Sequence, residues 1–305
     1  MWDSFSPFTP RTPKGKTPMN LKRDMKILAL KTLSTSPGSR PALARPILRL
    51  IRQGYGPIPK EREGAPSVCI SVDFDVTVPS RFDDNRKGTL ALLELAGRYG
   101  VPVTWAVCGK SAEADTRSYS AISDSRRDEI GVHTYSHIDA TVATAGEFRS
   151  DIERCVQVLG LDSPRSFVFP WNREAHFDVL RGLGFRVYRG KERSIGMPVQ
   201  KGGLWNVRPV YYVDQKSLGA ESLMKQYLDV CVALATPFHL WTHPWSLVSK
   251  GRTEPMMNTL ESLFAYVSER REMGELTTTT LGGIAVALDS HTESGVMPAP
   301  AAAVN

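Results

Sequence analysis

The sequence lacks the cysteine patterns that build disulfide frameworks or zinc knuckles. It holds four cysteines in 305 residues, with no Cys-x-x-Cys spacing. They are widely scattered in apolar stretches: Cys69, Cys108, Cys155 and Cys231. Cysteines used in this way are typical of free, buried thiols in a reducing compartment. We therefore expect a cytoplasmic protein.

Long apolar runs and several catalytic motifs are also missing. No run is long enough to span a bilayer, and residues 1–64 lack the apolar core of a secretory signal. Gly109-Lys110-Ser111 resembles the end of a phosphate-binding loop, but Thr104 stands where that loop requires its first glycine. Gly-x-Gly-x-x-Gly and Gly-x-Ser-x-Gly are absent too. Nucleotide-binding and serine-hydrolase functions are thus disfavoured.

Positive charge is confined to the start of the chain. Residues 1–64 contain 13 Lys and Arg against four Asp and Glu, whereas the remainder contains 25 against 28. The Pro-rich, basic segment is expected to be a solvated extension; a peripheral contact with an anionic membrane, through short helices at 22–32 and 46–53, is the alternative. No nucleic-acid partner is expected, because the rest is slightly acidic and carries no recognition motif.

Strand and helix patterns alternate along the rest of the chain. Strands are predicted at 67–75, 101–107, 130–133, 167–169, 185–188, 238–242 and 276–280. Helices are predicted at 89–99, 146–159, 175–183, 218–235 and 254–271. This alternation predicts an α/β fold of parallel strands with helical crossovers, in which functional groups gather at the carboxyl ends of the strands. We expect one such domain over 65–290, followed by a disordered tail at 291–305.

Two short segments suggest a metal site with an adjacent base. His133 and His137 are four residues apart, so that both imidazoles leave one side of a predicted helical turn. The strict alternation over 67–75 places Asp73 and Asp75 on one face at a strand end. Asp75 with the two histidines would leave a coordination position open, as catalytic zinc sites do, and Asp73 could take a proton from the attacking water. The alternative is a chance histidine spacing beside an Asp turn or cap.

Four motifs in order resemble those of one enzyme family. They are Asp73-Phe74-Asp75, His133-Thr134-Tyr135-Ser136-His137, Phe169-Pro170-Trp171, and an apolar strand that leads to His243. Over residues 67–288 the chain resembles the polysaccharide deacetylases (NodB homology, carbohydrate esterase family 4). The resemblance implies a distorted (β/α) barrel of the NodB type, a divalent metal such as Zn²⁺, and hydrolysis of an acetyl group on a sugar.

The resemblance also implies a role for each matching residue. Asp73 corresponds to the general base and His243 to the general acid. The metal ligands would be Asp75, His133 and His137. The backbone N–H of Trp171 resembles the second oxyanion donor of the family. Substrate contacts are expected from Pro170, Asn172, Arg173 and Trp241. For His243 and the tryptophans, the alternative is a place in the core.

Three departures from the family pattern indicate a divergent member. Phe74 separates two aspartates that the family usually has side by side. Val168 stands where the family has an arginine before the proline, and we hypothesise that Arg173 supplies that charge from the other side of Pro170. The family's fourth motif, which orients the catalytic acid, has no clear match, and Asp214 is a candidate by position.

The leading hypothesis is a metal-dependent deacetylase that acts on an acetylated amino sugar or glycan in cell-surface polysaccharide metabolism. A second hypothesis keeps the metal but changes the substrate to a non-sugar or cyclic amide. A third is a catalytically silent barrel that only binds glycan.

Overall fold

The computed structural model describes residues 66–76, 78–248 and 253–293. The predicted basic extension, its two candidate helices and the chain beyond residue 293 lie outside these ranges. Helix α11 (Leu281–Glu293) runs past His291, where the tail was predicted to begin.

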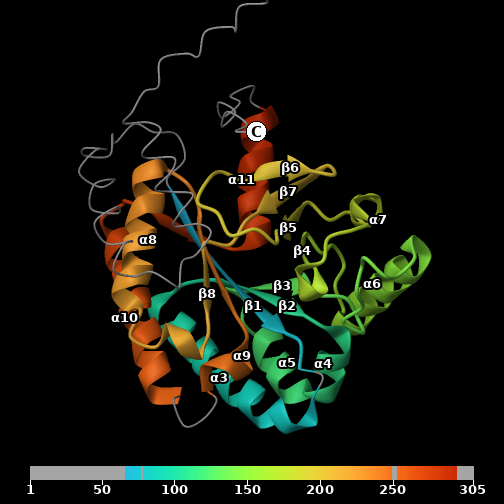
Figure 1. The fold of residues 1–305 in the computed structure, drawn as a ribbon, viewed down its shortest axis with the longest axis horizontal. Helices are drawn as coiled ribbons and strands as arrows, with labels where there is room; N and C mark the ends of the chain where they lie inside the picture. Colours follow the sequence, from blue (N-terminus) through green and yellow to red (C-terminus); the bar gives the residue numbers. More distant parts are fainter. Residues whose placement is uncertain (1–65, 77, 249–252, 294–305) are drawn as a thin grey trace, which may run out of the picture.

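A single curled sheet forms the centre of the structure (Figure 1). Its order is β6-β7-β5-β4-β3-β2-β1-β9-β8, and β10 pairs with β1 beside this path. The pairings are parallel except for the β6–β7 hairpin. The strands are β1 (Ser67–Phe74), β2 (Val103–Val107), β3 (Glu129–Val132), β4 (Ser166–Val168), β5 (Val187–Arg189), β6 (Val199–Lys201), β7 (Leu204–Val207), β8 (Tyr211–Val213), β9 (Phe238–Thr242) and β10 (Thr277–Thr279).

Strand β1 lies in the interior of the fold, with both of its faces covered by other parts of the chain. Its even-numbered residues pack into the main core with the outer helices: Val68, Ile70, Val72 and Phe74. Cys69 faces the concave side and joins a second apolar cluster formed with α11. Burial on both sides is typical of a parallel strand with helical crossovers. The polar Ser71 and Asp73 lie on the concave face as well, which sets the direction in which the site is built.

The concave face is closed at one end by α11. Ala106, Val168, Val187 and Val207 supply the strand side of this second cluster, and α11 contributes Leu281, Ile284, Ala285 and Leu288. Figure 1 shows α11 in red beside β5 and β7. This apolar cluster fills one end of the concave face. The polar side chains of the same face therefore lie at the other end, at the carboxyl ends of the strands.

The remaining helices surround the convex side. They are α3 (Phe82–Tyr99), α4 (Gly109–Ala114), α5 (Thr116–Ser123), α6 (Ala145–Leu159), α7 (Phe177–Gly182), α8 (Glu221–Leu234), α9 (Pro244–Val248) and α10 (Thr253–Glu272), with short 3-10 turns η1 (Pro79–Arg81), η2 (Pro170–Asn172) and η3 (Gln215–Ser217). Helix α6 begins at a capping box between Thr144 and Glu147 and ends at Gly160.

None of the helices in the described ranges combines the length and apolarity needed to cross a membrane.

The α/β prediction is confirmed, and the boundaries differ where periodicity gave no signal. Strand β9 has the predicted bounds. Helix α3 begins seven residues earlier than predicted, because tertiary contacts extend it: Arg86 pairs with Asp115 at 3.1 Å, and a side chain at Gly88 would clash with the backbone of Pro244. The short strands β6, β7 and β8 were not predicted.

Candidate metal centre and its surroundings

Asp75, His133 and His137 come together at the carboxyl ends of the strands. One ligand atom from each lies within 4.8 Å of the others. Asp75 follows β1 directly, His133 follows β3, and the two imidazole rings are 4.9 Å apart at their centroids. Residues distant in sequence therefore converge as the spacing and the strand alternation suggested.

The local structure of the histidine segment differs from the prediction. Residues 133–137 form a loop instead of a helical turn, with Thr134 and His137 both at φ 60°. Asp151 of α6 holds this loop: its carboxylate accepts hydrogen bonds from the N–H groups of Tyr135 and Ser136 at 2.7 and 3.1 Å, and from the Ser136 hydroxyl. The spacing of the two histidines could not predict this loop, because its shape depends on the hydrogen bonds from Asp151 of α6.

The protonation of His133 suits a metal ligand. Its Nδ1 lies 2.7 Å from the Val168 carbonyl oxygen, which can only accept, so Nδ1 carries the proton and Nε2 keeps its lone pair. Among the described residues, the buried Nε2 has no hydrogen-bond partner. Burial lowers the pKa of His133 to about 4, so that the imidazole is neutral at pH 7. An unpartnered nitrogen beside a carboxylate and a second imidazole fits a divalent cation.

Asp75 is held in its ionised form. Burial by itself would raise its pKa, but hydrogen bonds from His137 and His243, together with electrostatic attraction to His243 and His133, bring it well below the ordinary range. Its Oδ2 lies 3.4 Å from Nε2 of His137 and 3.5 Å from Nε2 of His243. A carboxylate in this state is ready to act as a ligand.

Asp73 pairs with an arginine that the sequence analysis did not identify. Arg189, the last residue of β5, donates from both Nη atoms to the Asp73 carboxylate at 2.5 and 2.6 Å. The pair is buried, with side-chain exposures of 1% and 4%. Burial alone would raise the pKa of Asp73, yet the guanidinium lowers it below its ordinary value. Asp73 is thus an ionised carboxylate oriented by a bidentate partner.

Arg189 takes the place of the arginine missing from β4. Val168 is its register partner on the neighbouring strand, so both side chains leave the same face of the sheet. The face of Trp241 lies 4.1 Å from the guanidinium, which fixes its plane. The hypothesis that Arg173 supplies this charge is wrong. Arg173 is half-exposed and pairs with Asp139, whereas the Asp73 carboxylate is bound by Arg189.

His243 follows β9 and faces both aspartates. Its Nε2 lies 3.8 Å from Asp73 Oδ2, and its Nδ1 lies 3.3 Å from the hydroxyl of Tyr212 on β8. Burial alone would lower the pKa of His243, but the hydrogen bond and charge of Asp75 raise it. Asp214 does not orient this histidine, since its carboxylate caps η3 through the Lys216 N–H at 2.8 Å. Tyr212 holds the position predicted for Asp214.

Segment 170–173 forms one rim of the site. Trp171 lies in η2 with φ 58°, the residue is 66% exposed, and its ring centroid is 4.8 Å from that of His137. Within the described ranges, its backbone N–H has no hydrogen-bond partner. Pro170 is buried, and the Asn172 side-chain oxygen lies 3.4 Å from Arg189. The rim therefore presents a free donor beside the metal-ligand cluster.

His176, His239 and the four cysteines lie outside the cluster. Buried His239 hydrogen-bonds Ser71 at 2.9 Å, and its pKa falls to about 3 because of burial. His176 contacts the Ala143 carbonyl oxygen at 2.9 Å. All four cysteines are free and buried, as predicted.

Arg189 and Tyr212 are the two residues that sequence reasoning missed. Each carries a signal that could have been used. Arg189 ends an apolar strand at the same position as the other site residues, and the predicted strand stopped one residue short of it. Tyr212 lies two residues before Asp214 in an apolar segment that forms β8.

Comparison with known proteins supports the resemblance. A model of the family described as polysaccharide deacetylase matches residues 69–181. A search among curated proteins finds no match. Among solved structures, a "putative polysaccharide deacetylase" from Mycobacterium smegmatis is 18% identical, with a TM-score of 0.61 and coverage of 79% of this chain and 95% of that one.

Two further structures share the fold. A "probable polysaccharide deacetylase" from Pseudomonas aeruginosa PAO1 is 14% identical, has a TM-score of 0.57, and is covered over 98% of its length by 80% of this chain. A carbohydrate esterase family 4 pseudoenzyme from Bacillus anthracis is 14% identical, with a TM-score of 0.50 and coverage of 73% of this chain and 66% of that one. At these identities the likeness establishes the fold, and it confirms the predicted NodB-type barrel.

Proposed function

We propose that this chain, a divergent relative of the polysaccharide deacetylases, is a metal-dependent hydrolase that removes an N-acetyl group from an amino sugar or glycan. The observation that carries the proposal is the arrangement of Asp75, His133 and His137 beside an Asp73 carboxylate that Arg189 holds ionised. A structural ion pair would not need a neutral imidazole with an unpartnered nitrogen next to it. A hydrolytic site needs both features.

The three candidate ligand residues would hold the cation, and a set of two imidazoles and one carboxylate favours zinc. Such an ion polarises a carbonyl and lowers the pKa of water. His133 is fixed for this task by its Nδ1 contact with the Val168 carbonyl. Asp151 positions His137 indirectly through the loop that carries it.

Asp73 acts as the general base. Its lowered pKa keeps it unprotonated at neutral pH, and Arg189 fixes the direction of its oxygens. A carboxylate beside the acetamide can take the proton of the attacking water. The Trp171 N–H, which has no partner within the described ranges, would donate to the oxyanion that forms.

His243 delivers the proton that the departing amine needs. Its raised pKa favours the imidazolium near neutrality, and its Nε2 faces the site between the two aspartates. The Tyr212 hydroxyl contacts Nδ1 and keeps the ring in this orientation. Acid and base thus stand at the carboxyl ends of two neighbouring strands, β9 and β1.

Acetate release tests the proposal. Purified protein should carry about one divalent ion per chain and release acetate from N-acetylated oligosaccharides. Asp73→Asn should keep the ion and lose at least about 100-fold in kcat, because general-base catalysis contributes on that order. Asp289→Asn, which removes an acid of α11 that pairs with Arg186 away from the cluster and the cleft, is the matched control.

The other hypotheses predict different results. Turnover of cyclic amides alone, with a full metal load, would assign the non-sugar substrate. Glycan binding without any ion or turnover would identify a silent barrel.

A further inference from the structure

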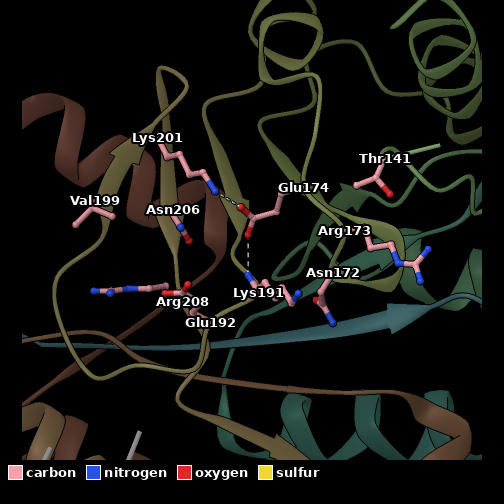
Figure 2. A pocket seen from close by; sticks show the side chains of 10 residues that line it. All are labelled: Thr141, Asn172, Arg173, Glu174, Lys191, Glu192, Val199, Lys201, Asn206 and Arg208. Atoms are coloured by element: carbon pink, nitrogen blue, oxygen red, sulfur yellow. Dashed lines mark hydrogen bonds and ion pairs between the residues drawn. The ribbon is translucent and has the colours of Figure 1, made fainter. Parts of the chain in front are cut away.

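We propose that the cleft beside the metal-ligand cluster binds an oxyanion of the substrate, either a sugar carboxylate or a phosphate. This inference rests on the proposed function, because it assigns the part of the glycan that lies next to the reacting acetamide. The cleft has a volume of about 650 Å³, within the range of small-ligand sites. It is drawn in Figure 2.

The cleft and the candidate active site share one wall. Asn172 and Arg173 line the cleft, and they directly follow Trp171, whose ring lies 4.8 Å from that of His137. Asn172 also contacts Arg189, the partner of Asp73. A substrate with its acetamide at the metal ligands therefore has its neighbouring group at the mouth of this cleft.

Ion pairs connect residues on the walls of the cleft, and one of them neutralises the carboxylate of Glu174. Glu174 accepts from Lys201 at 2.6 Å and from the Lys191 backbone N–H at 2.8 Å, as the dashed lines in Figure 2 show. Arg173 is engaged by Asp139. Because Glu174 is already paired, it does not repel an incoming anion.

Positive charge remains after these pairs are formed. The ammonium of Lys191 has no partner within the described ranges, and Arg208 donates only to the Met197 carbonyl oxygen, at 3.3 Å. Glu192 is the one lining acid left without a partner in the same part of the chain. Two free cations against one free acid favour an anionic ligand.

A buried amide marks the cleft as a binding site for a hydroxylated ligand. Asn206 is 9% exposed, lines the cleft, and its Oδ1 has no hydrogen-bond partner within the described ranges. It packs on Gly190, where any side chain would clash with the amide. Because that oxygen is enclosed against Gly190, the amide nitrogen Nδ2 is the atom of Asn206 that can reach the cleft, where it can donate to a sugar oxygen. Amide and cations together describe an acidic sugar or a sugar phosphate.

Calorimetric titration and acetate release with matched ligands test the assignment. The probes are a neutral tetramer of N-acetylglucosamine, a hyaluronan tetrasaccharide in which glucuronate alternates with N-acetylglucosamine, and uridine diphosphate N-acetylglucosamine. The protein should bind at least one acidic probe about tenfold more tightly than the neutral tetramer, since one charge-assisted contact accounts for such a ratio. Preference between the two acidic probes identifies carboxylate or phosphate as the source.

Variants of Lys191 identify the site. Lys191→Ala should remove most of the preference for the acidic probe and leave the neutral tetramer unaffected, whereas Lys191→Arg should retain it. Lys87→Ala removes an exposed lysine on α3 that has no part in the cleft, and it should change nothing. Equal binding of acidic and neutral probes, or an equal effect of Lys191→Ala on both, overturns the inference.

The result also separates the two proposals. A Lys191-dependent preference without acetate release would retain the cleft and reject the deacetylase. Acetate release without charge preference would do the reverse.

Discussion

Replacing Arg189 with methionine removes the partner of Asp73 and tests how the base is held ionised. The change leaves a carboxylate of 3% exposure without its two hydrogen bonds. Breaking a buried pair in this way lowers the free energy of unfolding by about 3–5 kcal/mol. The variant can avoid an unpaired buried charge by protonating Asp73. Protonating a carboxyl with the ordinary pKa of 3.8 costs about 4 kcal/mol at pH 7, which sets an upper limit on the loss in free energy of unfolding.

The sign of the pH dependence follows from the lowered pKa. In the native protein Asp73 stabilises the fold above its ordinary pKa, and this contribution is lost as pH falls through the lower folded value. The destabilisation caused by Arg189→Met should therefore be largest near neutral pH and shrink below about pH 4. Urea unfolding at pH 7 and pH 4 measures it.

The same substitution should reduce catalysis. Once Asp73 binds a proton at neutral pH, kcat/KM should fall at least about 100-fold, and the acid limb of the pH profile should move upward. Metal content should stay the same, because Arg189 contacts none of the three ligand residues. Arg98→Met is the control, since it removes an arginine that pairs with Glu261 on the outer helices α3 and α10, away from the cluster and the cleft; its kcat/KM should stay within about threefold.

Restoring the arginine one strand away provides a rescue. Val168 and Arg189 are register partners, about 5 Å apart across the parallel pair. The double variant Val168→Arg, Arg189→Val should recover part of the activity that Arg189→Val alone loses. Unchanged kcat/KM and an unmoved acid limb in Arg189→Met would refute the reasoning.

Three further predictions concern the acid and the metal. Tyr212→Phe removes the hydroxyl that lies 3.3 Å from His243 Nδ1, so kcat on acetamides should fall about tenfold at constant KM. The kcat on 4-nitrophenyl acetate should stay the same, because its leaving group departs without a proton. An equal loss on both substrates would contradict the proposal that Tyr212 orients His243 as the acid. The hydrogen bond and charge of Asp75 raise the pKa of His243 above that of a free imidazole, so kcat should decline as pH rises through the pKa of His243; a rate that grows steadily above pH 9 would exclude His243 as the acid. Chelation should abolish acetate release and added zinc should restore it in the native chain but not in His133→Ala; activity that persists after the ion is removed would speak against the centre.

The sequence allowed the fold class and the convergence of Asp75, His133 and His137 to be anticipated for one physical reason. A parallel strand that is buried on both faces can be recognised in the sequence by its apolar residues. In such a fold the functional groups lie at the carboxyl ends of the strands. Asp73, Asp75, His133 and His243 all stand at such ends. Their convergence follows from topology, and it does not depend on how each loop is shaped.

Features that depend on tertiary contacts could not be predicted. Residues 133–137 form a loop because Asp151 binds their backbone, and no local pattern encodes that contact. Arg189 was missed because its partner lies 116 residues away and the expected position was Val168 on the next strand. Asp214 was chosen by sequence position, but its carboxylate is used by its own turn, and Tyr212 occupies the place instead.

The most direct test of the account is anomalous diffraction at the zinc edge from crystals grown with zinc. We expect one strong peak per chain, within coordination distance of Asp75, His133 and His137, and its loss in His133→Ala crystals. A peak at other side chains, or none at these three while the protein still releases acetate, would contradict the proposed centre.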